Sequence, residues 1–189
     1  MGKLGFILIP IIIIAVLVFA AFGIYNGLVT SQEEAKTAWA QVENQYQRRA
    51  DLIPNLVETV KGFAQQEKTV LEDVTRLRSQ WGEARRTGDI NKSVQTAQAL
   101  DQALGRLMVV VERYPELKSN QNFLKLQDQL EGTENRISVE RRRYNEKVLE
   151  YNKKIRTFPG LLVAGIFGFD RMQLFEAEPG SRTAPKVKF

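Results

Sequence analysis

The sequence predicts an all-α protein: an N-terminal transmembrane helix followed by an antiparallel bundle of four long, kinked helices. Three observations lead to this prediction. An uncharged apolar run long enough to cross a bilayer stands near the N-terminus. Beyond it, apolar residues recur at alternating steps of four and three, which is the spacing of helices that bury one face. No segment competes with the strict polar–apolar alternation of a half-buried strand.

The predicted anchor covers residues 1–29, and no charged residue lies between Leu4 and Gln32. A helix over residues 4–25 is about 33 Å long, which matches a hydrocarbon core about 30 Å thick. The alternatives are a cleaved signal peptide and a buried core helix. Residues 20–22 fit a signal-peptidase site poorly, and a core helix rarely lacks a polar face, so a retained anchor is favoured.

The charges beside the anchor predict its orientation. Lys3 precedes the span, whereas Glu33 and Glu34 come first after it. Cytoplasmic flanks of membrane spans are enriched in Lys and Arg, so we expect a cytoplasmic N-terminus and an exported, periplasmic C-terminal domain. The expected location is therefore the bacterial inner membrane, with a single span.

The bundle domain is predicted over residues 30–158. Its first helix is expected to begin at Ser31, which stands at capping-box spacing from Glu34. Between Ala35 and Trp81, twelve of the fourteen positions at alternating steps of four and three are apolar. This pattern is a strong signal of helix packing.

Pro54 lies in the middle of this pattern, three residues after Asp51, which is a good N-cap residue. A chain reversal near Asp51 gives helices of better-matched length for antiparallel packing, and it is the arrangement we prefer. The alternative is one helix kinked at Pro54, which the unbroken apolar phase across the proline favours.

Two further helices complete the predicted bundle. Residues 85–88 end the preceding helix, and Asp89 follows as an N-cap. The next helix is expected to end near Pro115, and the last to run from about residue 120 to residue 157.

A separate apolar segment is predicted over residues 159–178. Its apolar centre is nine residues long and too short to span a bilayer. We expect it to pack across the end of the bundle; a self-association surface and insertion into the lipid interface are the alternatives. Residues 179–189 are predicted to form a flexible tail. The candidate interaction patch comprises Leu161, Leu162, Val163, Ile166, Phe167 and Phe169.

The chain has 189 residues, a net charge of +5, and neither cysteine nor histidine. It therefore offers no disulfide, thiolate nucleophile, imidazole base or His-ligated metal. Di-iron carboxylate bundles need Glu-x-x-His motifs, which this sequence lacks. We expect no catalytic residue, cofactor or metal site, and hence a protein that is not an enzyme.

Four charged residues are candidates for a polar interior. Arg49 and Glu67 interrupt the apolar seam, and Glu134 and Arg141 are seven residues apart in the last helix. Burying such charges costs several kcal/mol each unless they are paired. We expect them to pair between helices and set the register of the bundle. A carboxylate metal site or a polar binding cavity is the alternative.

Residues 140–156 carry seven basic and three acidic side chains. This mixture is typical of a solvated helix face, with anionic lipid headgroups as an alternative contact. Tyr144 and Tyr151 fall on the apolar seam, so we expect them to pack in the core rather than to stack on bases. No nucleic-acid partner is expected.

Several short motifs occur in order along the chain. They lie at residues 52–58, 61–64 with Glu67, 112–117, 122–123 with 126–127, 133–137, 143–145, 151–152 and 158–159. In these motifs the sequence resembles the LemA family of bacterial membrane-anchored helical proteins, over almost the whole chain. One departure is Gln66, where the family often has histidine before the glutamate.

The resemblance implies an anchor followed by a helical bundle, without an established enzymatic activity. It also implies companionship with other membrane proteins, and M48-type metalloproteases and TPM-domain proteins are the candidate partners. We therefore expect a non-enzymatic membrane-anchored scaffold or adaptor at the cell envelope, which binds protein partners or assembles as a homo-oligomer. The alternative is a lipid- or small-molecule-binding module that uses the polar interior or the apolar C-terminal patch.

Overall fold

The computed structural model describes residues 2–175, with side chains from Leu8 onward. The tail predicted over residues 179–189 and the end of the apolar segment predicted over 159–178 lie outside the described residues. Every regular element in the described part is a helix, so the all-α prediction is confirmed. The helices are α1 (Gly2–Phe63), α2 (Lys68–Thr87), α3 (Ile90–Val111), α4 (Pro115–Lys118), α5 (Gln121–Lys154) and α6 (Gly160–Phe167).

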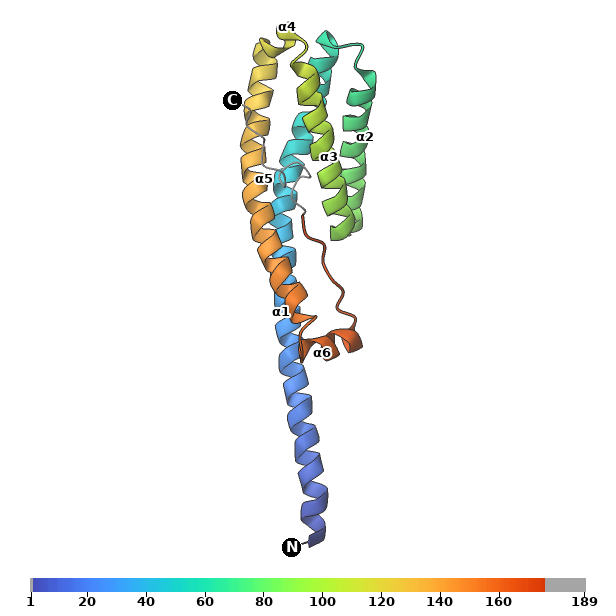
Figure 1. Ribbon diagram of the computed structural model, residues 1–189, viewed down its shortest axis with the longest axis vertical. Coiled ribbons are helices and arrows are strands. Elements are labelled where there is room, and N and C mark those ends of the chain that lie inside the picture. Colours follow the sequence, from blue (N-terminus) through green and yellow to red (C-terminus); the bar gives the residue numbers. More distant parts are fainter. Residues whose placement is uncertain (1, 176–189) are drawn as a thin grey trace, which may run out of the picture.

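Four long helices, α1, α2, α3 and α5, pack in an up-down-up-down bundle, which confirms the antiparallel prediction (Figure 1). α1 and α5 form the longest pair, and the α2–α3 hairpin covers the half of this pair farthest from the N-terminus. The short α4 joins α3 to α5 at that far end. The N-terminal part of α1 extends beyond the bundle as a single helix.

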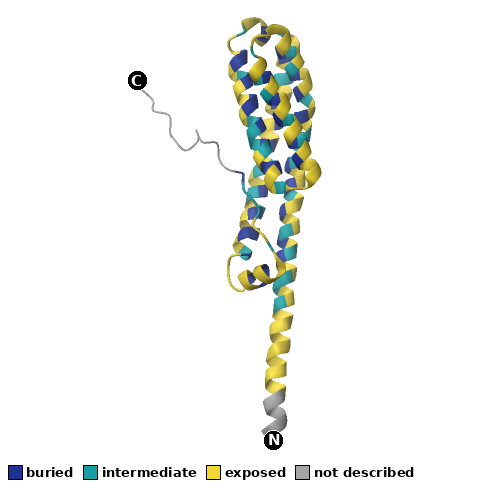
Figure 2. Ribbon diagram, turned by 90° about the vertical axis from the view of Figure 1, so that its right-hand side faces the viewer, coloured by how far each residue is buried: buried dark blue, intermediate teal, exposed yellow. Residues whose placement is uncertain are grey.

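The N-terminal part of α1 has the properties of a membrane span. It is the stretch, within the described residues, that is long and apolar enough to cross a membrane by its length and composition. Most of its side chains between Leu8 and Phe22 are exposed, in contrast to the buried rows of the bundle (Figure 2). The first fully buried residue of α1 is Leu28.

The expected helix start at Ser31 is wrong, because α1 continues from the anchor into the bundle without interruption. Ser31 lies inside the helix and is buried. The apolar run before it is itself helical, so no free N–H groups remain at residue 31 for a cap to satisfy.

The preferred chain reversal near Asp51 is also wrong, and a contact with α2 explains why the helix continues. Pro54 has no N–H, so the carbonyl of Ala50 loses its helical donor. The Arg78 side chain of α2 replaces it, donating from Nε to this carbonyl at 2.7 Å. The reversal between the first two bundle helices falls at residues 64–67 instead.

The other predicted helix boundaries, at the end of α2 and around α3 and α5, are confirmed within a few residues. Gly88 ends α2 in the left-handed conformation (φ +70°), which glycine adopts without steric cost. The Asp89 side chain then caps α3 by accepting from the Lys92 N–H at 3.0 Å. Asn120 caps α5 in the same way, accepting from the N–H groups of residues 122 and 123.

α6 lies beside α1 at the anchor end of the bundle and runs transverse to it (Figure 1). Its Val163 and Ala164 are buried in a small cluster with Leu28. The turn of the chain from the end of α5 into α6 depends on Gly160. A Cβ at this position would lie 2.2 Å from the carbonyl oxygen of Lys154, so no larger residue fits without a shift.

Candidate functional site

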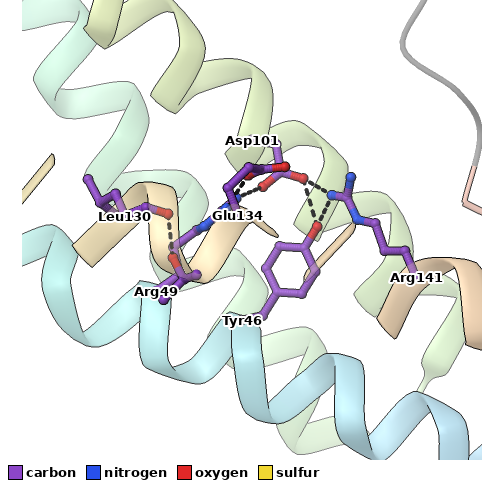
Figure 3. A network of polar contacts seen from close by, with 7 residues as sticks. Tyr46, Arg49, Asp101, Leu130, Glu134 and Arg141 are labelled. Carbon is purple, nitrogen blue, oxygen red and sulfur yellow. Dashed lines mark hydrogen bonds and ion pairs between the residues drawn. The ribbon is translucent and has the colours of Figure 1, made fainter. Parts of the chain in front are cut away.

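A buried ion network ties three bundle helices together. Arg49 of α1 is only 3% exposed, and its guanidinium pairs with the carboxylates of Asp101 on α3 and Glu134 on α5. Arg141 of α5 pairs with Asp101 from the other side (Figure 3). Two guanidinium groups therefore face two carboxylates, and the formal charge of the network is zero.

Tyr46 completes this ion network. Its hydroxyl donates to Asp101 at 2.7 Å and accepts from Arg141. The Arg141 guanidinium also lies over two aromatic rings, 5.3 Å from the Tyr46 centroid and 4.7 Å from that of Phe175. Such a cation–π contact favours a charge that is withdrawn from water.

Three of the four predicted polar-interior residues meet in this network, and Glu67 does not. Glu67 lies at the reversal after α1 and accepts from Arg113 at 2.9 Å and from the Tyr114 hydroxyl at 3.4 Å. Its separation follows from the reversal at residues 64–67, which places it at the far end of the bundle.

The hub of the network, Asp101, was not predicted from the sequence. A signal was present, because Asp101 stands between Ala97 and Leu104 at the step of four and three that marks the buried face of α3. An acidic residue on an apolar seam needs a buried cation, and Arg49 and Arg141 supply it.

A cavity of about 410 Å³ adjoins the network between α3 and α5. Arg49, Asp101 and Glu134 form one wall, and apolar side chains such as Leu104 and Phe123 form much of the rest. Its size suits a small ligand. Within residues 2–175 no three acidic side chains gather as they would around a metal ion.

The second polar arrangement holds the residues that follow α6. We call residues 170–175 the C-terminal strap; it runs as an extended chain beside α5, back toward the bundle (Figure 1). The Asn152 amide donates to the Met172 carbonyl at 2.8 Å and accepts from the Met172 N–H at 3.0 Å. Asn145 makes the same pair of bonds with Phe175, both at 2.9 Å.

Two tyrosine hydroxyls extend this set. Tyr151 donates to the carbonyl of Asp170 at 2.8 Å, and Tyr144 to that of Gln173 at 2.9 Å. Seven residues of a helix rise about 10.5 Å, and three residues of an extended chain span about 10 Å. The two Tyr-Asn pairs are seven residues apart on α5, and they therefore contact equivalent backbone groups that are three residues apart on the strap. We call this surface of α5 the strap groove.

The strap groove ends in an aromatic pocket for Phe175. Its ring lies 5.7 Å from that of Tyr144, 6.0 Å from Trp39 and 6.4 Å from Tyr46, centroid to centroid. Arg141 joins this pocket to the ion network. Burial raises the pKa of the phenols of Tyr144 and Tyr151, so both stay protonated as hydrogen-bond donors at neutral pH.

Sequence reasoning placed Tyr144 and Tyr151 in the core but missed their role toward the strap. The available signal was the repeated dipeptide Tyr-Asn at residues 144–145 and 151–152. Asparagine is rarely buried, and two asparagines at one heptad position indicate a partner whose backbone needs donors and acceptors.

The candidate interaction patch divides into two parts. Val163 is buried, and Phe169 is half-buried with its ring 5.6 Å from that of Tyr25. The other patch residues are exposed on α6; they are Leu161, Leu162, Ile166 and Phe167.

Comparisons with known proteins show what this chain is similar to in sequence. The model of the LemA family matches residues 38–189. Magnetosome protein MamQ of Magnetospirillum gryphiswaldense is 29% identical over 182 residues, covering 84% of this chain and 67% of that protein. Protein LemA of Metamycoplasma hominis is 27% identical over 177 residues, covering 93% of this chain and 79% of that protein. With its apolar N-terminal helix, the chain is a membrane-associated helical protein. The chain belongs to the LemA family.

Proposed function

We propose that this protein is a non-enzymatic, membrane-anchored scaffold that holds extended protein segments in its strap groove. The observation that carries the proposal is the double Tyr-Asn set on α5. These side chains bond to the backbone of four strap residues, at positions 170, 172, 173 and 175. Bonds to the backbone place little restriction on the side chains of the bound segment. Backbone recognition of an extended chain is a common mode of protein–protein binding.

A second copy of this chain is the simplest partner for the groove. The strap of a neighbour offers the same backbone groups as the chain's own strap, so exchange between copies preserves every contact. Exchange of this kind makes the protein a homo-oligomer. The family resemblance adds M48-type metalloproteases and TPM-domain proteins as candidate partners that offer other segments.

Strap exchange is testable because the chain has no cysteine. Gln95 Nε2 of α3 donates to Gln173 Oε1 of the strap at 3.1 Å, so the ends of these two side chains meet, and cysteines at the two positions lie within reach of a short bifunctional maleimide. One tagged copy carries Gln95→Cys and a second, differently tagged copy carries Gln173→Cys. We expect a cross-linked heterodimer when the two are co-expressed and treated with this reagent in the membrane.

The matched control replaces Gln95→Cys with Ser79→Cys, an exposed position on α2. It should give no heterodimer with Gln173→Cys. If the reagent joins both cysteines within one chain while the mixed copies never cross-link, self-assembly by strap exchange is refuted.

Binding of a foreign segment is tested with a fluorescent peptide of residues 168–175 and a chain that ends at Gly168. The peptide should bind this shortened chain. Asn145→Ala removes two hydrogen bonds, worth about 1–3 kcal/mol together, and should weaken binding about 5- to 150-fold. No binding by a shortened chain that retains its helical circular-dichroism signal contradicts the adaptor function.

We propose a single-pass topology in the bacterial inner membrane with the bundle in the periplasm, on the basis of Lys3 before the anchor and Glu33 and Glu34 after it. Val109→Cys on α3 tests it, because this side chain is 69% exposed. In spheroplasts it should react with a membrane-impermeant maleimide. Reaction only after lysis places the bundle in the cytoplasm.

A second candidate function is binding of a small molecule in the cavity beside Arg49, favoured by its mixed polar and apolar walls. Native mass spectrometry of the detergent-released protein should then retain a bound mass. That mass should be lost in Gly105→Phe, which fills the cavity, and in Arg141→Ala, which removes part of the ion network. Retention in both variants excludes this site.

A further inference from the structure

The outer face of α6 is apolar, and the described residues leave more than half of the surface of each of its large side chains exposed. Leu161, Leu162, Ile166 and Phe167 are between 54% and 78% exposed, and Phe158 just before the helix is 80% exposed. These residues follow one another over ten positions and form one patch rather than scattered surface residues. An exposed apolar patch of this kind marks a contact with a membrane or with another protein surface.

The position of α6 along α1 indicates that this contact is with the membrane. α6 packs around Leu28, and the Phe167 ring lies 4.8 Å from that of Tyr25. Residues 4–25 are about as long as the hydrocarbon core is thick, so Tyr25 falls at its boundary. α6 therefore lies where the acyl chains meet the headgroups, and across the direction of the span (Figure 1).

The side chains around α6 suit this boundary. Tyrosine is enriched at membrane interfaces, and Tyr25 lies there in contact with the apolar rings of Phe167 and Phe169. Lys153 and Arg156 are exposed cations at the end of α5, just before α6, and cations of this kind favour contact with anionic lipid headgroups. The exposed large apolar side chains of the anchor end at Phe22, and the α6 patch follows at the next level of α1, where Tyr25 and Leu28 lie.

We propose that α6 is an interfacial helix, whose apolar face enters the outer edge of the bilayer beside the anchor. With α1 crossing the membrane and α6 lying in its surface, the bundle has two attachments. A single span allows the domain to tilt and rotate, whereas the second attachment fixes its orientation toward the membrane. This inference does not depend on the strap groove.

Site-directed spin labelling of the full chain tests the proposal. Single cysteines at Leu162 and Ile166, which are 59% and 78% exposed, receive a nitroxide label. The protein is reconstituted in vesicles of phosphatidylcholine and phosphatidylglycerol in equal amounts. Collision rates with oxygen, which concentrates in lipid, and with a water-soluble nickel chelate are then compared. The ratio of oxygen to nickel collisions should rise several-fold over that of a label in water.

Two positions of matched exposure serve as references. Phe19→Cys in the anchor is 80% exposed and reports lipid, whereas Val109→Cys on α3 is 69% exposed and reports water. Ratios at positions 162 and 166 close to that at 19 support the proposal. Ratios equal to that at 109 overturn it. Low collision rates with both reagents, together with spin–spin broadening, also overturn it, because they mean that another copy of the chain covers the patch.

Discussion

Asp101→Asn is the sharpest test of the ion network. The substitution keeps the size of the side chain and removes the charge that faces Arg49, Arg141 and the Tyr46 hydroxyl. Arg49 is then left with Glu134 as its carboxylate partner, and this side chain is 49% exposed. The new amide also directs N–H groups at guanidinium groups that can only donate.

The expected loss follows from burial. Asp101 is 11% exposed and Arg49 3%, so the substitution leaves a charge in a low-dielectric interior without its main partner. Removing one member of a buried ion pair costs about 3–5 kcal/mol. For a domain of this size, each kcal/mol lowers the melting temperature by about 2–4 °C, so we expect a decrease of about 6–20 °C.

Thermal unfolding of detergent-solubilised protein, followed by circular dichroism, measures this loss. The matched control is Asp73→Asn, because Asp73 also faces two arginines, Arg76 at 2.9 Å and Arg106 at 3.7 Å. Its carboxylate is 36% exposed, and a pair of this kind contributes only about 0–1 kcal/mol. If the two variants differ by less than about 1 kcal/mol, burial does not give the network its strength and the reasoning is refuted.

Three further predictions concern the fold. Arg78→Met should lower the free energy of unfolding in urea by about 1–3 kcal/mol, because it leaves the Ala50 carbonyl without a donor. In a Pro54→Ala background, where the helix restores an N–H, the same change should cost less than about 0.5 kcal/mol; equal losses contradict this account. Gly160→Ala should displace α6 and speed its amide hydrogen exchange, since the new Cβ meets a backbone oxygen at 2.2 Å; unchanged protection would show that α5 yields instead. Burial raises the pKa of Tyr144 above its unfolded value of about 10, so the contribution of this residue to stability should be constant below that pH and be lost as pH rises above it. Tyr144→Phe should reduce this alkaline loss in unfolding curves, and an unchanged slope would exclude Tyr144 as its source.

The fold class was predictable because the signals for it are local. The apolar run of the anchor, the steps of four and three, and the caps at Asp89 and Asn120 depend on residues within one or two helical turns. Each of these interactions joins residues that are close in the chain, so it can be recognised from residue types at a fixed spacing. The helix ends that were wrong, at Ser31 and Asp51, also fitted local rules. At Ser31 the helix of the anchor continues into the bundle, and at Asp51 a hydrogen bond from Arg78 of α2 replaces the donor lost at Pro54.

The candidate site was predictable only in part. The burial of Arg49 and the partial burial of Arg141 follow from their place on apolar seams, and that requires carboxylates nearby. Which carboxylates supply the charge depends on the helix that packs opposite, and Asp101 lies 52 residues from Arg49 along the chain. Glu67 carried the same sequence signal as Arg49 but was separated from it by the reversal at residues 64–67.

By itself, the sequence determined that this protein is an apolar anchor followed by amphipathic helices, because hydrophobic periodicity and capping act over a few residues. Only the tertiary structure decided that α1 continues through Pro54, since the missing helical donor comes from Arg78 on another helix. The same holds for the strap, whose extended backbone has no partner within its own segment. Its donors and acceptors are satisfied by Asn145 and Asn152 of α5, and such pairing exists only once the chain has folded back on itself.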